Sequence, residues 1–385
     1  MKKIRVKNKN KIAIVFSGGV VKAAAFHIGV VSALRDFGIT FKGGIKKTED
    51  QPDTTAGENE ISVYVGSSAG SLVSSFLAQG GEIDDLINIF NKNIKDSNIP
   101  NLKLWELVHP RALGQLKFLF PKEFIFKFLK DKTIQSPFGT QGIVKYLKNH
   151  IVKTSDFSKI DSELYIVTTD LNSDKKIICG SKELKSNNLC NIYRTDISLL
   201  DAAAASMSLP PLYHPFRVKV GDEILDLYDG ELKQPLNEHV AIEAGADLII
   251  CSYTHQPLNV LKNSKSLSSE GIHNISLQAF YQMFEGKIKD AQDSRLKEKL
   301  LLADVKDFFE QNNLDQELAE ELMKSLEKRM NYRRNLDFIF IHPDPTDIKM
   351  FQAPNFSLNK KKMNDVLKNG YDRAKKILQE NLEIN

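Results

Sequence analysis

The residues of this chain best suited to chemistry lie in the pentapeptide Gly66-Ser67-Ser68-Ala69-Gly70. A Gly-x-Ser-x-Gly sequence between a strand and a helix is typical of a nucleophile elbow, where the central serine has a strained backbone and an exposed hydroxyl. Glycines at both ends remove the Cβ atoms that would clash in so tight a turn. N–H groups at the start of the following helix favour developing negative charge. The pattern predicts Ser68 as a nucleophile, and a small-residue turn without chemistry is the alternative.

A second glycine turn, Ser17-Gly18-Gly19-Val20, lies between a predicted strand and a predicted helix. Such a turn lets backbone N–H groups point at an anion. The spacing fits neither the dinucleotide fingerprint nor the P-loop, because the first needs Gly-x-Gly-x-x-Gly and the second needs Gly-Lys-Ser/Thr. The turn therefore predicts a backbone donor site. Lys22, one turn into the helix, either binds substrate or is a solvated lysine.

A carboxylate that could accept a proton from the serine is Asp229, which ends a predicted strand and precedes Gly230. Serine needs such a base because its free hydroxyl is barely ionised at neutral pH. The chain order Ser68, Asp229, His255 would also suit an α/β-hydrolase triad, with His239 as another candidate, and each histidine could instead be structural. The neighbouring Glu231 either raises the pKa of Asp229 or points to solvent.

Alternating strands and helices predict an α/β protein with a largely parallel sheet covered on both faces. In such a sheet, ligands bind at the carboxyl ends of the strands, where the three segments above would meet. The expected strands are Lys11–Phe16, Ile61–Val65, Leu164–Thr169, Lys176–Cys179, Ile224–Tyr228, Asp247–Cys251 and Leu336–Ile341. The expected helices are Val20–Phe37, Ala69–Gln79, Gln141–Val152, Asp201–Met207 and Asn359–Asn381.

Composition places broad limits on function. The formal net charge of +4 is too small to imply nucleic-acid binding. We see no metal-ligand spacing and expect neither a metal nor a cofactor. The longest apolar runs are too short for a signal peptide or a membrane-spanning helix, and three scattered cysteines suit a reducing compartment. We therefore expect a cytoplasmic protein that could bind a membrane peripherally, and the sequence predicts no oligomeric state.

Two segments depart from the alternating pattern within one domain expected over residues 8–383. A cap at about 82–152 includes Phe118–Phe128, in which phenylalanines are interleaved with lysines. Such a basic aromatic segment could contact a lipid surface, or it could pack on the core. A charged helical arm is expected at about 264–335.

Taken together, the elbow, the glycine turn Ser17–Ala23 and Asp229-Gly230 resemble the patatin-like phospholipases, especially the bacterial members. Further similar segments are Ala25–Val30, Thr169–Leu171, Ala205–Pro215, Ile341–Pro343 and Asn369–Tyr371, so the resemblance covers nearly the whole chain. It implies a three-layer α/β/α fold and a Ser–Asp dyad without histidine. Ser68 would attack an ester carbonyl, Asp229 would accept its proton, and amides of Gly18, Gly19 and Val20 would hold the oxyanion.

Two departures from the family pattern affect the expected site. The glycine turn usually reads Gly-Gly-Gly-x-Arg-Gly, whereas this chain has Val20, Lys22 and Ala23 in place of the third glycine, the arginine and the last glycine. Lysine keeps the charge but loses the bidentate fork for phosphate. A small residue usually follows Asp-Gly, and here it is Glu231.

The resemblance implies a serine lipid acyl hydrolase that cleaves carboxyl esters of membrane lipids, without a metal in the catalytic step. Two alternatives remain: an esterase with a Ser-Asp-His triad, and a catalytically impaired, patatin-shaped lipid-binding protein.

Overall fold

The structure is a computed structural model that describes residues 3–48, 52, 54–90, 98–100, 102–107, 109–110, 136–260, 266–330 and 332–384. Its main sheet has ten strands, seven of them in the order β10-β11-β7-β4-β2-β12-β13. Five neighbours run parallel, as the alternating sequence pattern predicts. They are β7 (Glu163–Asp170), β4 (Glu60–Gly66), β2 (Ile12–Phe16), β12 (Leu248–Ser252) and β13 (Asp337–Ile341).

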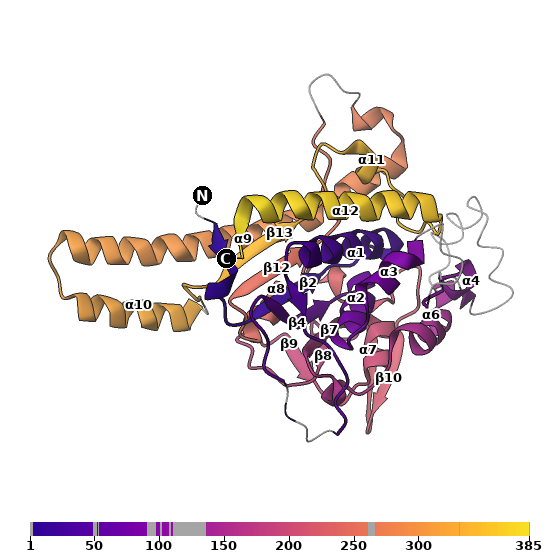
Figure 1. Ribbon diagram of the computed structural model, residues 1–385, viewed down its shortest axis with the longest axis horizontal. Helices are drawn as coiled ribbons and strands as arrows, with labels where there is room; N and C mark the ends of the chain where they lie inside the picture. The colour runs from indigo at the N-terminus through magenta and orange to yellow at the C-terminus, as the bar shows by residue number, and fades with distance from the viewer. Residues whose placement is uncertain are drawn as a thin grey trace.

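Helices cover both faces of the parallel strands (Figure 1). Along β2, Ile12, Ile14 and Phe16 pack into one apolar cluster, while Ala13 and Val15 pack into the other. Because successive residues of a strand face opposite sides, this alternation means that both faces are buried. The first layer contains α1 (Val20–Asp36), α2 (Ala69–Ala78), α3 (Ile83–Phe90), α7 (Leu199–Ser206) and α12 (Lys360–Asn381). The opposite layer contains α8 (Glu238–Glu243) and part of α9 (Ile272–Gln311), which confirms the predicted three-layer α/β/α fold.

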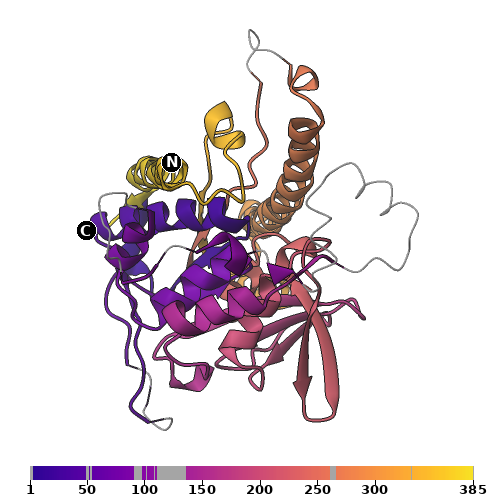
Figure 2. The same cartoon turned by 90° about the vertical axis from the view of Figure 1, so that its right-hand side faces the viewer.

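Beyond β7, the sheet contains antiparallel pairs of strands. Strand β11 (Glu223–Asp229) pairs antiparallel with β7 and with β10 (Phe216–Val220). The two-stranded β10–β11 hairpin extends from the edge of the sheet (Figure 2). Strand β8 (Lys176–Gly180) also pairs antiparallel with β7, and β9 (Asn191–Arg194) lies beside β8. The sequence pattern did not predict β9 or β10.

A pair of helices extends away from the sheet over the residues where a charged helical arm is expected (Figure 1). Helix α9 is 40 residues long, and α10 (Gln316–Met330) returns beside it. Within the expected cap, the structure describes α3, α4 (Leu104–Leu107), β5 (His109–Pro110), β6 (Phe138–Gly139), α6 (Gln141–Tyr146) and η3 (Leu147–Ile151). The segment Phe118–Phe128 lies outside the described residues, so its predicted lipid contact stays a prediction.

Short elements complete the fold. Strands β1 (Ile4–Arg5) and β14 (Leu382–Glu383) pair with each other, so both ends of the chain lie together (Figure 1). The others are β3 (Thr40–Phe41), α11 (Ile348–Phe351), η1 (Val6–Asn8), η4 (Phe157–Lys159), η5 (Gly230–Leu232) and η6 (Leu267–Ser269). Among the described residues, none of the helices combines the length and the apolar character that crossing a bilayer requires.

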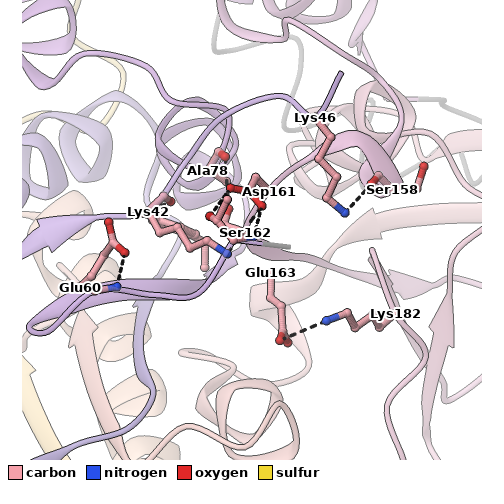
Figure 3. A network of polar contacts seen from close by, with 12 residues as sticks. Lys42, Lys46, Glu60, Ala78, Ser158, Asp161, Ser162, Glu163 and Lys182 are labelled. Carbon is pink, nitrogen blue, oxygen red and sulfur yellow. Dashed lines mark hydrogen bonds and ion pairs between the residues drawn. The ribbon is translucent and has the colours of Figure 1, made fainter. Parts of the chain in front are cut away.

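A polar network ties loops together near the amino ends of β4 and β7 (Figure 3). Nζ of the buried Lys42 lies 3.8 Å from Oδ1 of Asp161, and the hydroxyl of Ser162 donates to the carbonyl oxygen of Ala78 at 3.2 Å. Glu163, at the start of β7, lies 3.4 Å from Lys182. These contacts hold the edge of the sheet opposite the glycine turn and the Ser68 elbow, so we assign them a structural role.

Candidate active site

Ser68 sits at the turn between β4 and α2 with a backbone that serine rarely adopts. Its φ and ψ angles are 51° and −122°, and it forms the N-cap of α2. The flanking glycines are required by close packing: a Cβ at Gly66 would lie 2.2 Å from Ser74 Oγ, and one at Gly70 would lie 2.3 Å from the carbonyl oxygen of Phe16. The local structure is therefore the strained strand-to-helix elbow that the Gly-x-Ser-x-Gly spacing predicts.

The register of the sheet brings Asp229 to the level of Ser68. Gly66 pairs with Ile166 of β7, and Asp229 pairs with Thr168 of the same strand. Ser68 and Thr168 each lie two residues beyond the Gly66–Ile166 pair, so Ser68 and Asp229 both lie past the carboxyl end of β4. Strand β11 is antiparallel to β7, so Asp229 does not reach the site as the carboxyl end of a parallel strand. It reaches the site because β7 extends past the carboxyl edge and β11 pairs with the extension.

The end of α7 supports both candidate residues. The backbone N–H of Ser68 donates to Ser206 Oγ at 2.8 Å, and that hydroxyl donates to the carbonyl oxygen of Val167 at 2.7 Å. The N–H of Asp229 donates to the carbonyl oxygen of Ser208 at 3.2 Å. Sequence reasoning assigned no role to these two serines, although the family-like segment Ala205–Pro215 contains both.

Asp229 is only 2% exposed, and its carboxylate lies close enough to the Ser68 hydroxyl to interact with it. It accepts a hydrogen bond from the N–H of Glu231 at 2.9 Å. Burial raises the pKa of Asp229 to about 6, while the Glu231 N–H and the Ser68 hydroxyl act in the opposite direction. A carboxylate with this pKa can accept a proton near neutral pH.

The glycine turn after β2 packs directly against Ser68. A Cβ at Gly18 would lie 2.8 Å from Ser68 Cβ and 2.9 Å from Glu231 Cγ, so only glycine fits between them. Gly19 is the N-cap of α1 with φ of 125°, and Val20 has φ of 60°. Among the described residues, no backbone acceptor lies within hydrogen-bond range of the Gly19 and Val20 N–H groups. Both amides are therefore available to an anion at the start of α1.

Glu231 is buried, so the expectation that it could point to solvent is wrong. Its side chain belongs to a residue that is 4% exposed, and both carboxylate oxygens lack a well-formed hydrogen bond among the described residues. The amides of Gly18 and Leu236 and the hydroxyl of Ser67 surround it closely enough to lower its pKa. Burial, followed by the charge of Asp229, has the larger effect and raises the pKa of Glu231 well above its ordinary value. Burial and the neighbouring Asp229 carboxylate thus both favour the protonated form of Glu231.

Lys22 lies in a different environment from Ser68. Its residue is 1% exposed, and its ammonium donates to the carbonyl oxygen of Phe351 at 3.2 Å and to the hydroxyl of Tyr281 at 3.4 Å. Burial lowers the pKa of Lys22 to about 7, against a smaller opposite effect of Asp347. Its side chain thus ties α1 to α9 and α11, and its predicted contact with substrate stays a prediction.

The two histidines of the alternative triad are held by other partners. His255 stacks on Phe284 with ring centroids 4.7 Å apart, and its Nδ1 lies 3.9 Å from the Glu231 carboxylate. His239 shares a hydrogen bond of 3.0 Å with Lys176. Among the described residues, neither ring forms a hydrogen bond with Ser68 or Asp229. Also within this part of the chain, no group of three or more His, Cys, Asp or Glu side chains could hold a metal ion.

An apolar cavity opens beside Ser68. Its wall includes Val20, Ala24 and Ile28 of α1, which recur every four residues on one helix face, and Leu72 of α2. Further lining residues come from α3, α6 and the segment after α7, and they are largely hydrophobic. An apolar cavity next to a serine and a carboxylate suits a hydrocarbon chain attached to a reacting polar group.

The fold and site define a three-layer α/β/α protein with a Gly-x-Ser-x-Gly elbow at the carboxyl edge of its sheet. A family model described as patatin-like phospholipase matches residues 14–242, more than half of the chain. The chain therefore belongs to the patatin-like phospholipase family, a family of lipid acyl hydrolases, and the predicted resemblance is confirmed. The comparison with curated proteins finds no match.

Proposed function

We propose that this protein is a serine lipid acyl hydrolase that cleaves carboxyl esters of membrane lipids with a Ser68–Asp229 dyad. The observation that carries the proposal is the buried Asp229 carboxylate, which interacts with the Ser68 hydroxyl at the wall of an apolar cavity. Family membership gives the reaction class, and the geometry supports the assignment of these two residues.

In the proposed reaction, Ser68 Oγ attacks the ester carbonyl carbon while its proton passes to Asp229. The oxyanion that forms would be stabilised by the free amides of Gly19 and Val20 at the start of α1. Collapse of this intermediate breaks the ester bond, and Asp229 returns the proton to the leaving alcohol. Water then attacks the acyl-enzyme, with Asp229 as the base, and releases the fatty acid and free Ser68.

The apolar cavity supports a lipid rather than a small polar ester as the substrate. Its walls are hydrophobic side chains, and each methylene of a bound chain would contribute about fourfold to binding if buried there. We propose that the acyl chain lies along the cavity while the alcohol portion of the lipid stays outside.

A fluorophosphonate probe, with peptide mapping by mass spectrometry, tests the nucleophile. We expect labelling of Ser68 and none of the adjacent Ser67, whose hydroxyl accepts a hydrogen bond from Asn237. Ser68→Ala and Asp229→Asn should abolish hydrolysis of p-nitrophenyl butyrate and of phosphatidylcholine vesicles. Asp226→Asn is the matched control, because Asp226 lies on the same strand but pairs with Arg217 at the surface.

Each alternative gives a different result in these assays. A Ser-Asp-His triad requires that His239→Gln or His255→Gln abolish hydrolysis, whereas the dyad leaves both variants active. A folded protein that is not labelled at Ser68 would be a lipid-binding member of the family without catalysis. Full activity of Asp229→Asn would remove the dyad.

A further inference from the structure

Val20 and Glu231, two of the residues that depart from the family pattern, meet at the same turn. Gly18 lies directly between Ser68 and Glu231, with 2.8 and 2.9 Å separating its would-be Cβ from Ser68 Cβ and Glu231 Cγ. Val20 is only two residues further along the chain. The Glu231 side chain therefore packs against the turn next to Ser68, on the side of Gly18 where a Cβ would point.

The turn needs support because Val20 has a backbone conformation that suits glycine. Its φ of 60° lies in the left-handed region, where a β-branched residue is a genuine outlier. Nearby, Ser68 and Leu236 also have positive φ angles, of 51° and 55°. Strained residues of this kind persist only where the surrounding structure holds them in place.

Glu231 is placed to provide that support. Its carboxyl group lies close to the amides of Gly18 and Leu236 and to the hydroxyl of Ser67. A buried acid whose oxygens form no well-aligned hydrogen bond carries a desolvation cost that the small residue usual at this position would avoid. The side chain also fills the volume beside Gly18 that a small residue would leave open.

We propose that Glu231 is a positioning residue that compensates for Val20, because its side chain braces Gly18 and so holds the strained glycine turn against Ser68. The third glycine of the family pattern would reach the same backbone conformation without strain, and the brace would then be unnecessary. The catalytic part of this inference rests on the proposed function, in which the turn supplies the oxyanion donors. The structural part, the coupling of Glu231 to Val20, does not.

A double-mutant cycle with Val20→Gly and Glu231→Ala tests the coupling. In the wild-type background, Glu231→Ala should lower kcat and the rate of fluorophosphonate labelling by about tenfold or more, with KM changed by less than about threefold. The isosteric Glu231→Gln should stay within about threefold of wild type, because it fills the same space. In the Val20→Gly background, Glu231→Ala should also cost less than about threefold. Equal losses in both backgrounds, or no loss in either, would overturn the proposal.

The same cycle measured by urea unfolding does not require activity. The destabilisation caused by Glu231→Ala should be smaller in the Val20→Gly background than in the wild-type background. Glu223→Ala, which changes an exposed glutamate of β11, should cost the same in both. A Glu231→Ala variant that folds only together with Val20→Gly is the extreme form of this coupling. Additive changes in the free energy of unfolding would contradict the proposal that Glu231 supports the turn. If the wild type neither hydrolyses esters nor labels, the proposed function fails, and the unfolding cycle still decides the brace.

Discussion

If Asp229 is the base, activity must decrease as pH is lowered. The midpoint of this decrease reports the pKa of Asp229, which burial of the carboxylate raises. The base acts only when ionised, and burial raises its pKa from 3.8 to about 6. At pH 5 about a tenth of the molecules would carry an ionised Asp229, whereas an ordinary aspartate would be more than about nine-tenths ionised. The rate should therefore drop about tenfold between pH 8 and pH 5.

The assay is kcat/KM for p-nitrophenyl butyrate from pH 4 to pH 8 at constant ionic strength, because kcat/KM reports the free enzyme. Circular dichroism at each pH shows whether the fold survives. Other buried groups can be separated from Asp229. Burial lowers the pKa of His255 to about 3 and that of His27 to about 4, so neither titrates near pH 6.

Lys22, with a pKa of about 7, is another group that titrates in this range. A requirement for its charged form would make activity fall as pH rises, which is the opposite direction. Lys22→Met should therefore keep the acid midpoint near 6. A wild-type rate at pH 5 within about twofold of that at pH 8, with the fold intact, would refute the assignment of a buried Asp229 as the base.

Three further predictions follow from the packing around the same site. Ala24→Leu should narrow the cavity between Val20 and Ile28. The ratio of kcat/KM for p-nitrophenyl decanoate to that for the butyrate should then fall by about tenfold or more, since each lost methylene contact costs about fourfold. An unchanged ratio would place the acyl chain of the substrate elsewhere. Asp229→Asn should stabilise the fold at pH 8 by up to about 3 kcal/mol but not at pH 3.5, because a raised folded-state pKa lowers wild-type stability as pH rises from 3.8 to about 6. Urea unfolding at both pH values measures this difference, and equal effects at the two pH values would contradict the raised pKa. Gly18→Ala should abolish hydrolysis with little change in far-UV circular dichroism, because its Cβ would displace the nucleophile, and retained activity would show that the turn can move.

Local chemistry in the sequence was enough to predict the elbow. A Cβ at Gly66 would lie 2.2 Å from Ser74 Oγ, and a Cβ at Gly70 would lie 2.3 Å from the carbonyl oxygen of Phe16. These clashes are the physical reason why the motif has glycine at both positions. The parallel strands were equally readable, because a strand buried on both faces appears as a short continuous apolar run, as in Ile12–Phe16. Helix α12 begins where its capping residue predicts, with Asn359 accepting a hydrogen bond from the N–H of Lys362.

The environment of a polar side chain was much less readable than its place in the chain. Glu231 looks like a surface residue in sequence, because glutamate is rarely buried, yet it is 4% exposed. Lys22 looks like a solvated helix lysine, yet it is enclosed by α9 and α11, whose contacting residues come 259 and 329 positions later in the chain. These positions depend on which distant elements pack over α1 and η5, and no local pattern encodes that.

The place of Asp229 in the fold could not be predicted from strand direction alone. Parallel strands end together at the carboxyl edge of a sheet. Strand β11 runs antiparallel to β7, and an antiparallel strand that spanned the sheet would end at the opposite edge. The residue reaches Ser68 only because β7 continues to Asp170, four residues past the partner of Gly66, and offers Thr168 as the partner of Asp229. A register shift of one residue would turn the Asp229 side chain to the other face of the sheet, away from the nucleophile. The meeting of the two side chains is thus a property of strand length and register, which neither the Gly-x-Ser-x-Gly motif nor Asp-Gly specifies.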